Sequence, residues 1–111
     1  MAVSDGDVIL VDKDMGLVTN VFNDYKLAAL PGYLAIGHTR YSTTGSSCYS
    51  AAQPVHRSAG RADSPHSFAL AHNGNLTNTE ALAVEAGMLP GMIASDSELI
   101  AELVARAYPT D

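Results

Sequence analysis

The sequence predicts an α+β fold in one small domain or part of a larger one, and three observations support this prediction. The chain has 111 residues, 47% hydrophobic and 16% charged, a mixture typical of one globular unit. Short apolar and β-branched segments such as 8–11 are typical of strands. Near the C-terminus, the apolar segments 81–84 and 99–104 each follow a helix-start signal.

The N-terminal third predicts a hairpin followed by a short helix. Residues 8–11 form the first strand, and residues 12–16 carry the Asp and Gly of a turn. Residues 17–22 alternate as a return strand, which completes a β-hairpin. Residues 24–30 are a short helical candidate that the following Pro-Gly pair would end.

Two more strands are predicted on either side of a long loop. Residues 33–38 are apolar and typical of a strand. Residues 43–67 are rich in Ser, Gly and Pro without periodicity, so we expect a loop, and loops above about 12–15 residues are usually functional or disordered. Residues 67–72 predict a buried strand that the Asn-Gly-Asn turn at 73–75 closes.

Two helices complete the prediction. Thr77 and Glu80 have capping-box spacing before the first, and Gly87 is a suitable stop. Ser95 and Glu98 repeat this spacing before the second. One face of the second helix would be apolar, formed by Leu99, Ile100, Leu103 and Val104.

Composition excludes several functional classes. The net charge of −6 argues against nucleic acid and anionic membrane surfaces as partners. The sequence has no apolar run near the roughly 18–20 residues that span a bilayer, and residues 1–7 lack the features of a secretory signal. One cysteine cannot form an intrachain disulfide, which favours a reducing, cytoplasmic setting.

Basic residues gather in the middle of this acidic chain. Residues 33–72 contain Arg40, Arg57, Arg61 and all four histidines, with Asp63 as the one acid. This distribution suggests a site for an anion, although chance explains three arginines in one stretch equally well.

Three polar segments could carry chemistry. In residues 37–45, Arg40 offers a bidentate fork for a carboxylate or phosphate, with hydroxyls and a glycine turn behind it. The alternative is a surface arginine beside a turn.

In the second segment, residues 72–76, the Asn73 amide and the Gly74 N–H could form an oxyanion hole, where losing one donor costs about 2.7–4 kcal/mol of transition-state stabilisation. The alternative is that Asn-Gly is simply a turn, as it most often is.

The third segment is residues 95–98. Asp96 could bind a substrate ammonium, or it could serve only the helix dipole beside the N-cap Ser95. Taken together, an Arg for a carboxylate, an Asp for an ammonium and an Asn-Gly pair for an oxyanion describe an amino acid whose side-chain carbonyl is attacked.

The same segments stand in the order and approximate spacing of a known family. They are Gly37-His38-Thr39-Arg40-Tyr41-Ser42-Thr43-Thr44-Gly45, Ala52-Gln53-Pro54, Ala71-His72-Asn73-Gly74-Asn75-Leu76 and Ser95-Asp96-Ser97-Glu98. With them the chain resembles class II glutamine amidotransferase domains, which are N-terminal-nucleophile hydrolases. The resemblance covers nearly the whole chain and implies a four-layer αββα sandwich, of which residues 1–111 would be one partial domain.

The resemblance also implies a role for each matching residue. The glutamine α-carboxylate would be bound by Arg40 in a pocket lined by Thr43 and Thr44. The oxyanion hole would consist of the Asn73 side chain and the Gly74 N–H, and the α-ammonium would be held by Asp96 with help from Gly74. Tyr41 would belong to the gate toward the acceptor site.

Within the family, the chain is most similar to members that transfer the ammonia to phosphoribosyl pyrophosphate in purine synthesis. The hairpin segment 9–18 supports this branch, whereas the glucosamine-6-phosphate synthase branch would have Trp where this chain has Tyr41. The implied partners are glutamine and phosphoribosyl pyrophosphate. The implied full enzyme is a cytoplasmic homo-oligomer that uses Mg²⁺ and, in some members, a 4Fe–4S cluster, both outside this chain.

The family's nucleophile is a cysteine at the processed N-terminus, whereas this chain begins Met-Ala-Val-Ser and Cys48 is its one thiol. Cys48 lies in a loop without an α-amino base, and a Cys48–His56 or Cys48–His66 pair is the less favoured alternative. We therefore expect an internal fragment of the glutaminase domain that is inactive alone and lacks the nucleophile strand and the phosphoribosyltransferase domain. The alternatives are a non-catalytic amino-acid-binding module, the glutaminase domain of another class II amidotransferase, and a purely structural module.

Overall fold

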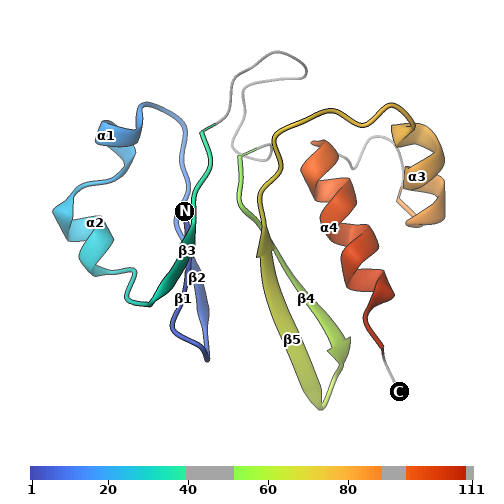
Figure 1. Ribbon diagram of the computed structural model, residues 1–111, viewed down its shortest axis with the longest axis horizontal. Coiled ribbons are helices and arrows are strands. Elements are labelled where there is room, and N and C mark those ends of the chain that lie inside the picture. Colours follow the sequence, from blue (N-terminus) through green and yellow to red (C-terminus); the bar gives the residue numbers. More distant parts are fainter. Residues whose placement is uncertain (40–51, 89–94, 110–111) are drawn as a thin grey trace.

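The computed structural model describes residues 1–39, 52–88 and 95–109. Within these residues, two antiparallel sheets and four helices form an α+β fold, which confirms the predicted class. In Figure 1 the first sheet lies with α1 and α2 on one side of the molecule, and the second sheet lies with α3 and α4 on the other. The two halves meet where β2 approaches β5.

The first sheet has the strand order β2-β1-β3, with β1 (Ala2–Ser4) in the centre. Both β2 (Ile9–Val11) and β3 (Leu34–Ile36) pair with it antiparallel. The predicted strand at 33–38 is therefore confirmed, and the strand at 8–11 forms the hairpin partner of β1. The buried side chains of this sheet belong to its central strand, at Ala2 and Val3.

The predicted return strand at 17–22 is wrong. Residues Val18–Val21 form the helical turn α1, with Val21 buried. The hairpin partner of β2 is the preceding strand β1. Segment 17–22 satisfies its own backbone groups in a helical turn, with hydrogen bonds from the Val21 N–H to the Leu17 carbonyl and from the Phe22 N–H to the Val18 carbonyl. The helix predicted at 24–30 is confirmed as α2 (Asp24–Ala28), whose N-cap Asn23 accepts a hydrogen bond from the Lys26 N–H.

The second sheet is a hairpin of β4 (Val55–Arg61) and β5 (Ser64–Leu70). Its first strand lies within the loop predicted for 43–67, so that prediction is wrong over residues 55–61 and 64–67. Residues 43–51 of this predicted loop lie outside the described residues. Its second strand confirms a strand at 67–72, but begins three residues earlier and ends two earlier. The predicted burial of this strand is wrong, because its residues are exposed or only partly buried. At the tip, Arg61 forms a two-point ion pair with Asp63, at 2.8 Å and 2.9 Å.

Helix α4 (Asp96–Ala107) packs along β4 and carries α3 (Thr79–Glu85) on its other side (Figure 1). Ser95 is confirmed as the N-cap of α4, because its hydroxyl accepts from the Glu98 N–H at 3.3 Å. The one at Thr77 is wrong, because the N-cap of α3 is Asn78 and no side chain caps it. At the other end, Gly87 follows α3 with a φ of +70°, as a helix stop requires.

The core between α3 and α4 is small. Leu99, Ala83 and Ala86 are its buried centre, and partly buried Leu76, Leu82, Met88 and Leu103 pack around them. The apolar face predicted for α4 is confirmed at Leu99, whereas Val104 is 38% exposed. Farther along α4, the Tyr108 ring stacks on Phe68 and His66 of β5, which fastens the end of the helix to the hairpin.

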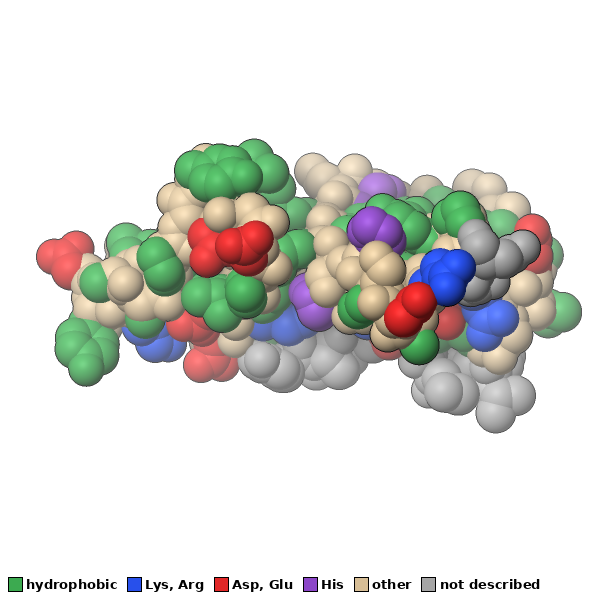
Figure 2. All heavy atoms as spheres, turned by 90° about the horizontal axis from the view of Figure 1, so that it is seen from below, with side chains coloured by type: hydrophobic (Ala, Val, Ile, Leu, Met, Phe, Trp, Pro, Cys, Tyr) green, Lys and Arg blue, Asp and Glu red, His purple; other side chains and the backbone are tan. Residues whose placement is uncertain are grey.

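The molecule is flat, with principal extents of 42 × 39 × 18 Å. Its radius of gyration of 15.0 Å exceeds the roughly 13 Å of a compact chain of about 100 residues. Apolar side chains are exposed on both halves (Figure 2), among them Leu17, Tyr25, Tyr33, Leu34 and Val84. No helix in the described ranges is long and apolar enough to cross a membrane.

Candidate functional site

The site predicted from the sequence lies partly within the described residues. Asn73, Gly74 and Asp96 are described, as are the motifs around Gln53 and His72. Arg40, Tyr41, Thr43, Thr44 and Cys48 lie outside the described residues. The structure therefore shows how the turn at 73–75, the start of α4 and the segment around Gln53 are arranged. The α-carboxylate pocket around Arg40 stays a prediction.

Asp96 is the first residue of α4 and reaches the turn after β5. One of its carboxylate oxygens, Oδ2, accepts a hydrogen bond from the Leu76 N–H at 2.7 Å. This short, charge-assisted bond joins two motifs that are 20 residues apart in the sequence. Because a carboxylate has about four acceptor positions, Asp96 keeps capacity for a substrate ammonium while it holds Leu76. The structure thus brings Asp96 close to the segment that contains Asn73 and Gly74.

The turn at 73–75 is exposed and begins where the strand pairing ends. The β4–β5 ladder stops at Leu70, and Asn73 and Gly74 both face solvent. Gly74 also passes close to the neighbouring His72 ring, because a Cβ at position 74 would lie 2.8 Å from His72 Nε2. A side chain at this position would require the His72 ring to move, whereas Gly74 fits without any shift and lies in an exposed turn.

Side chains from two other motifs hold the start of this turn. The His72 N–H donates to Gln53 Oε1 at 2.7 Å. The His72 carbonyl oxygen lies 3.2 Å from His38 Nε2, which is the donor in this pair. These bonds take the place of strand pairing beyond Leu70, so three of the four sequence motifs meet at His72 and the fourth joins them through Asp96.

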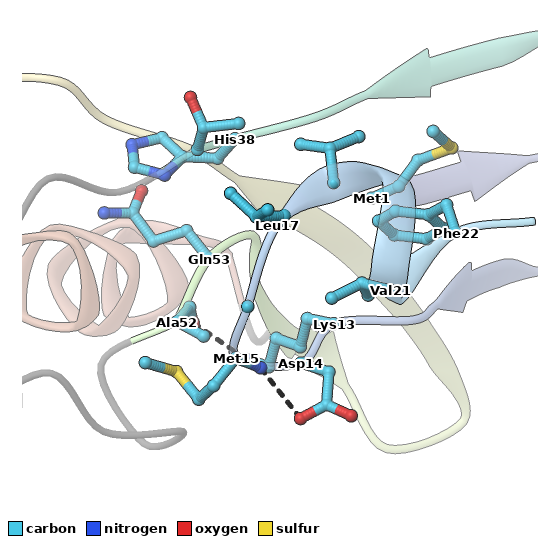
Figure 3. Close-up of a pocket in the computed structure, with 13 residues that line it drawn as sticks. Met1, Lys13, Asp14, Met15, Leu17, Val21, Phe22, His38, Ala52 and Gln53 are labelled. Atoms are coloured by element: carbon cyan, nitrogen blue, oxygen red, sulfur yellow. Dashed lines mark hydrogen bonds between the residues drawn. The ribbon is translucent and has the colours of Figure 1, made fainter.

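A pocket of about 380 Å³ lies next to this junction (Figure 3). Gln53 and His38 lie side by side at its edge, and Lys13 lies beside Ala52. Its remaining wall is mostly apolar, with Met15, Leu17, Val18, Val21 and Phe22. Asn73, Gly74 and Asp96 do not line it, so the pocket adjoins the predicted site without containing its described residues.

Sequence reasoning missed the contribution of Lys13. Its ammonium donates to the carbonyl oxygens of Ala52 and Pro54, at 3.1 Å and 3.2 Å. Burial lowers the pKa of Lys13, and the positive charge of Arg57 lowers it further, while Glu98 raises it. No local pattern marked this lysine, since its partners lie about 40 residues away in the chain.

The basic middle of the chain has a structural explanation at two of its three arginines. Arg57 on β4 forms ion pairs with Glu98 at 3.3 Å and Glu102 at 3.5 Å on α4. Arg61 pairs with Asp63 within the hairpin tip. Arg57 and Arg61, to which the sequence assigned no role, therefore neutralise acids of the chain itself, and the anion-site interpretation concerns Arg40.

No group of three His, Cys, Asp or Glu in the described ranges is arranged to hold a metal ion. The Mg²⁺ ion and the 4Fe–4S cluster implied by the resemblance stay expectations.

Comparison with known proteins identifies a homologous segment. The chain is 45% identical over 112 aligned positions to the amidophosphoribosyltransferase of Mycobacterium tuberculosis, covering 95% of the chain and 21% of that protein. It is 47% identical to the one from Synechococcus elongatus and 44% identical to the one from Methanocaldococcus jannaschii, each over 96% of the chain.

No family model and no solved structure matches the chain. The chain spans about a fifth of the length of the curated relatives that it matches. It is homologous, over nearly all of its own length, to one segment of amidophosphoribosyltransferases.

Proposed function

We propose that this chain is the glutamine-binding part of the glutaminase domain of an amidophosphoribosyltransferase. The observation that carries the proposal is the meeting of the family's motifs in space. Asp96 holds Leu76, two residues after Gly74, while Gln53 and His38 hold His72, one residue before Asn73. The homology to amidophosphoribosyltransferases supports the same function.

In this proposal the glutamine backbone is bound by two opposite charges. Arg40 holds the α-carboxylate with Thr43 and Thr44 beside it, and Asp96 holds the α-ammonium. A hydrogen bond to a charged group contributes about 1.5–3 kcal/mol, so the two ends together select a free amino acid. Tyr41 belongs to the gate that separates this site from the acceptor site.

The chemical step takes place at the glutamine side-chain amide. Attack by the family's cysteine thiolate on the amide carbon turns the carbonyl oxygen into an oxyanion, which the Asn73 amide and the Gly74 N–H stabilise. Collapse of this intermediate breaks the C–N bond, releases ammonia as the leaving amine takes up a proton, and leaves a glutamyl thioester on the cysteine. Water then hydrolyses the thioester to glutamate and frees the thiol. The ammonia then displaces pyrophosphate from phosphoribosyl pyrophosphate and gives phosphoribosylamine.

The proposal is tested with the protein expressed from its complete reading frame. With phosphoribosyl pyrophosphate, Mg²⁺ and glutamine labelled with ¹⁵N at the amide, we expect ¹⁵N in the phosphoribosylamine and glutamate as the second product. Binding of glutamine without release of ammonia would contradict the proposal and favour a non-catalytic amino-acid-binding module. Transfer of the ¹⁵N to another acceptor would identify a different class II amidotransferase.

A further inference from the structure

The Ala52-Gln53-Pro54 motif has no role in the site proposed above, yet the structure buries it. The Gln53 side chain is 8% exposed, and Pro54 is among the fully buried residues. Burying a neutral amide costs free energy unless it forms hydrogen bonds. The Gln53 Oε1 atom meets this requirement with the His72 N–H, at 2.7 Å.

This hydrogen bond fixes the peptide group at the start of the oxyanion turn. His72 directly precedes Asn73, and its N–H and carbonyl are both held by side chains rather than by a neighbouring strand. The direction of the Asn73 side chain and of the Gly74 N–H depends on the backbone that enters the turn. A change at Gln53 is therefore transmitted to both oxyanion donors without contact with the substrate.

Lys13 holds the Gln53 backbone in turn. Its ammonium donates to the carbonyls on both sides of Gln53, those of Ala52 and Pro54. Lys13 comes from the segment after β2, whereas Gln53 precedes β4, so this contact crosses from one half of the molecule to the other (Figure 3). A series of hydrogen bonds thus links Lys13 to the Gln53 backbone and the Gln53 side chain to His72. His72 in turn precedes the oxyanion donors of Asn73 and Gly74.

We propose that Gln53, held by Lys13, is a positioning residue for the oxyanion hole of Asn73 and Gly74. The inference rests on the proposed function and adds two residues to it. Oxyanion donors act only within about 2.7–3.1 Å of the developing charge, so their placement controls the rate. A misplacement of about 1 Å can cost about a hundredfold in rate. Gln53 itself neither transfers a proton nor forms a bond to substrate.

The first test changes Gln53 in the protein expressed from its complete reading frame. We expect Gln53→Ala to lower the kcat of glutamine-dependent synthesis about ten- to a hundredfold. The KM for glutamine should stay within about threefold, because the charges of Arg40 and Asp96 provide most of the binding of the α-groups. Gln53→Glu keeps an acceptor oxygen for the His72 N–H and should recover most of the kcat. Synthesis from free ammonia should be unchanged in both variants.

The second test changes Lys13, with the chain's other lysine as its matched control. Lys13→Met removes the donors to Ala52 and Pro54 and should lower kcat in the same direction as Gln53→Ala. Lys13→Arg keeps a cationic donor and should restore part of the rate. Lys26→Met makes the same chemical change on α2, away from the site, and should leave kcat unchanged.

A measurement independent of activity follows the hydrogen bond itself. Hydrogen exchange of the His72 amide, measured by NMR or on peptides that span residues 68–76, should be faster in Gln53→Ala than in the unchanged protein. Unchanged exchange, or an equal loss of glutamine- and ammonia-dependent synthesis, would overturn the positioning role. If the unchanged protein itself fails to use glutamine, the proposed function fails instead, and the exchange measurement still decides whether Gln53 holds the turn.

Discussion

Single side chains hold the candidate site together where regular secondary structure ends. His72 and Leu76 flank the exposed turn, and each donates its N–H to a side chain from a distant motif. Asp96 has a double role in this arrangement, because it fixes the Leu76 backbone and is the proposed partner of the substrate ammonium. These two roles can be separated by substitution.

The variant Asp96→Asn keeps an acceptor oxygen for the Leu76 N–H but removes the negative charge. We expect the KM for glutamine to rise about tenfold or more, since a charge-assisted hydrogen bond is lost. We expect the free energy of unfolding to change by less than about 1 kcal/mol. Steady-state kinetics and urea unfolding provide the two numbers.

Asp96→Ala is the matched comparison, because it removes the acceptor as well as the charge. It should raise the KM similarly and also lower the free energy of unfolding by about 1–3 kcal/mol. If Asp96→Asn left the KM unchanged, Asp96 would be a structural cap and the ammonium would bind elsewhere.

At the scale of elements, the sequence predicts well where one local signal is strong. The Ser95 cap and the Gly87 stop act within a few residues, and the helices they bound are observed. Strand β4 was missed because its Ser and Gly residues and the short turn that follows obscure the alternation of apolar and polar residues. Its pairing with β5 becomes recognisable only once the hairpin register is known. The alternating segment 17–22 failed for a different reason, since β2 pairs with the strand before it and segment 17–22 closes a helical turn with its own backbone hydrogen bonds.

The two capping boxes provide a direct test at this scale. Ser95 caps α4 with a hydrogen bond, so Ser95→Ala should lower the free energy of unfolding by about 1 kcal/mol. Thr77 lies outside α3, whose N-cap is Asn78, so Thr77→Ala should change the free energy of unfolding by less than about 0.5 kcal/mol. Chemical denaturation of the two variants measures both values. An equal loss for Thr77→Ala would restore the capping box that the sequence predicted there.

The turn between β1 and β2 makes stability depend on pH. The Asp5 carboxylate accepts from the Asp7 and Val8 N–H groups, at 2.9 Å and 2.8 Å, and these bonds lower its pKa below the ordinary value of 3.8. A lowered folded-state pKa means that the stabilisation is present above pH 3.8 and is lost as the pH falls through the folded-state pKa.

Asp5→Asn removes the titrating group at this turn. Urea unfolding between pH 6 and the acid range should therefore show a difference in free energy between the unchanged chain and Asp5→Asn that shrinks as the pH falls. A difference that stays constant across this range would show that the carboxylate charge does not stabilise the turn.

At the scale of the whole molecule, the site depends on contacts between segments far apart in the sequence. Arg57 ties β4 to α4 through Glu98 and Glu102, and Lys13 ties the first half to the segment before β4. The motif order indicated which segments belong together, and the structure brings the described ones together. The motif order could not indicate the hydrogen bonds of Lys13 and Gln53, because long-range partners leave no periodic pattern in a single sequence.

The most direct measurement compares glutamine with free ammonia as nitrogen donor in Arg40→Ala, made in the protein expressed from its complete reading frame. We expect glutamine-dependent phosphoribosylamine formation to fall about tenfold or more, since Arg40 would hold the α-carboxylate. Ammonia-dependent formation should stay within about twofold, because ammonia bypasses the glutamine site. Equal loss of both activities, or no loss of either, would contradict the assignment of these residues as a glutamine site.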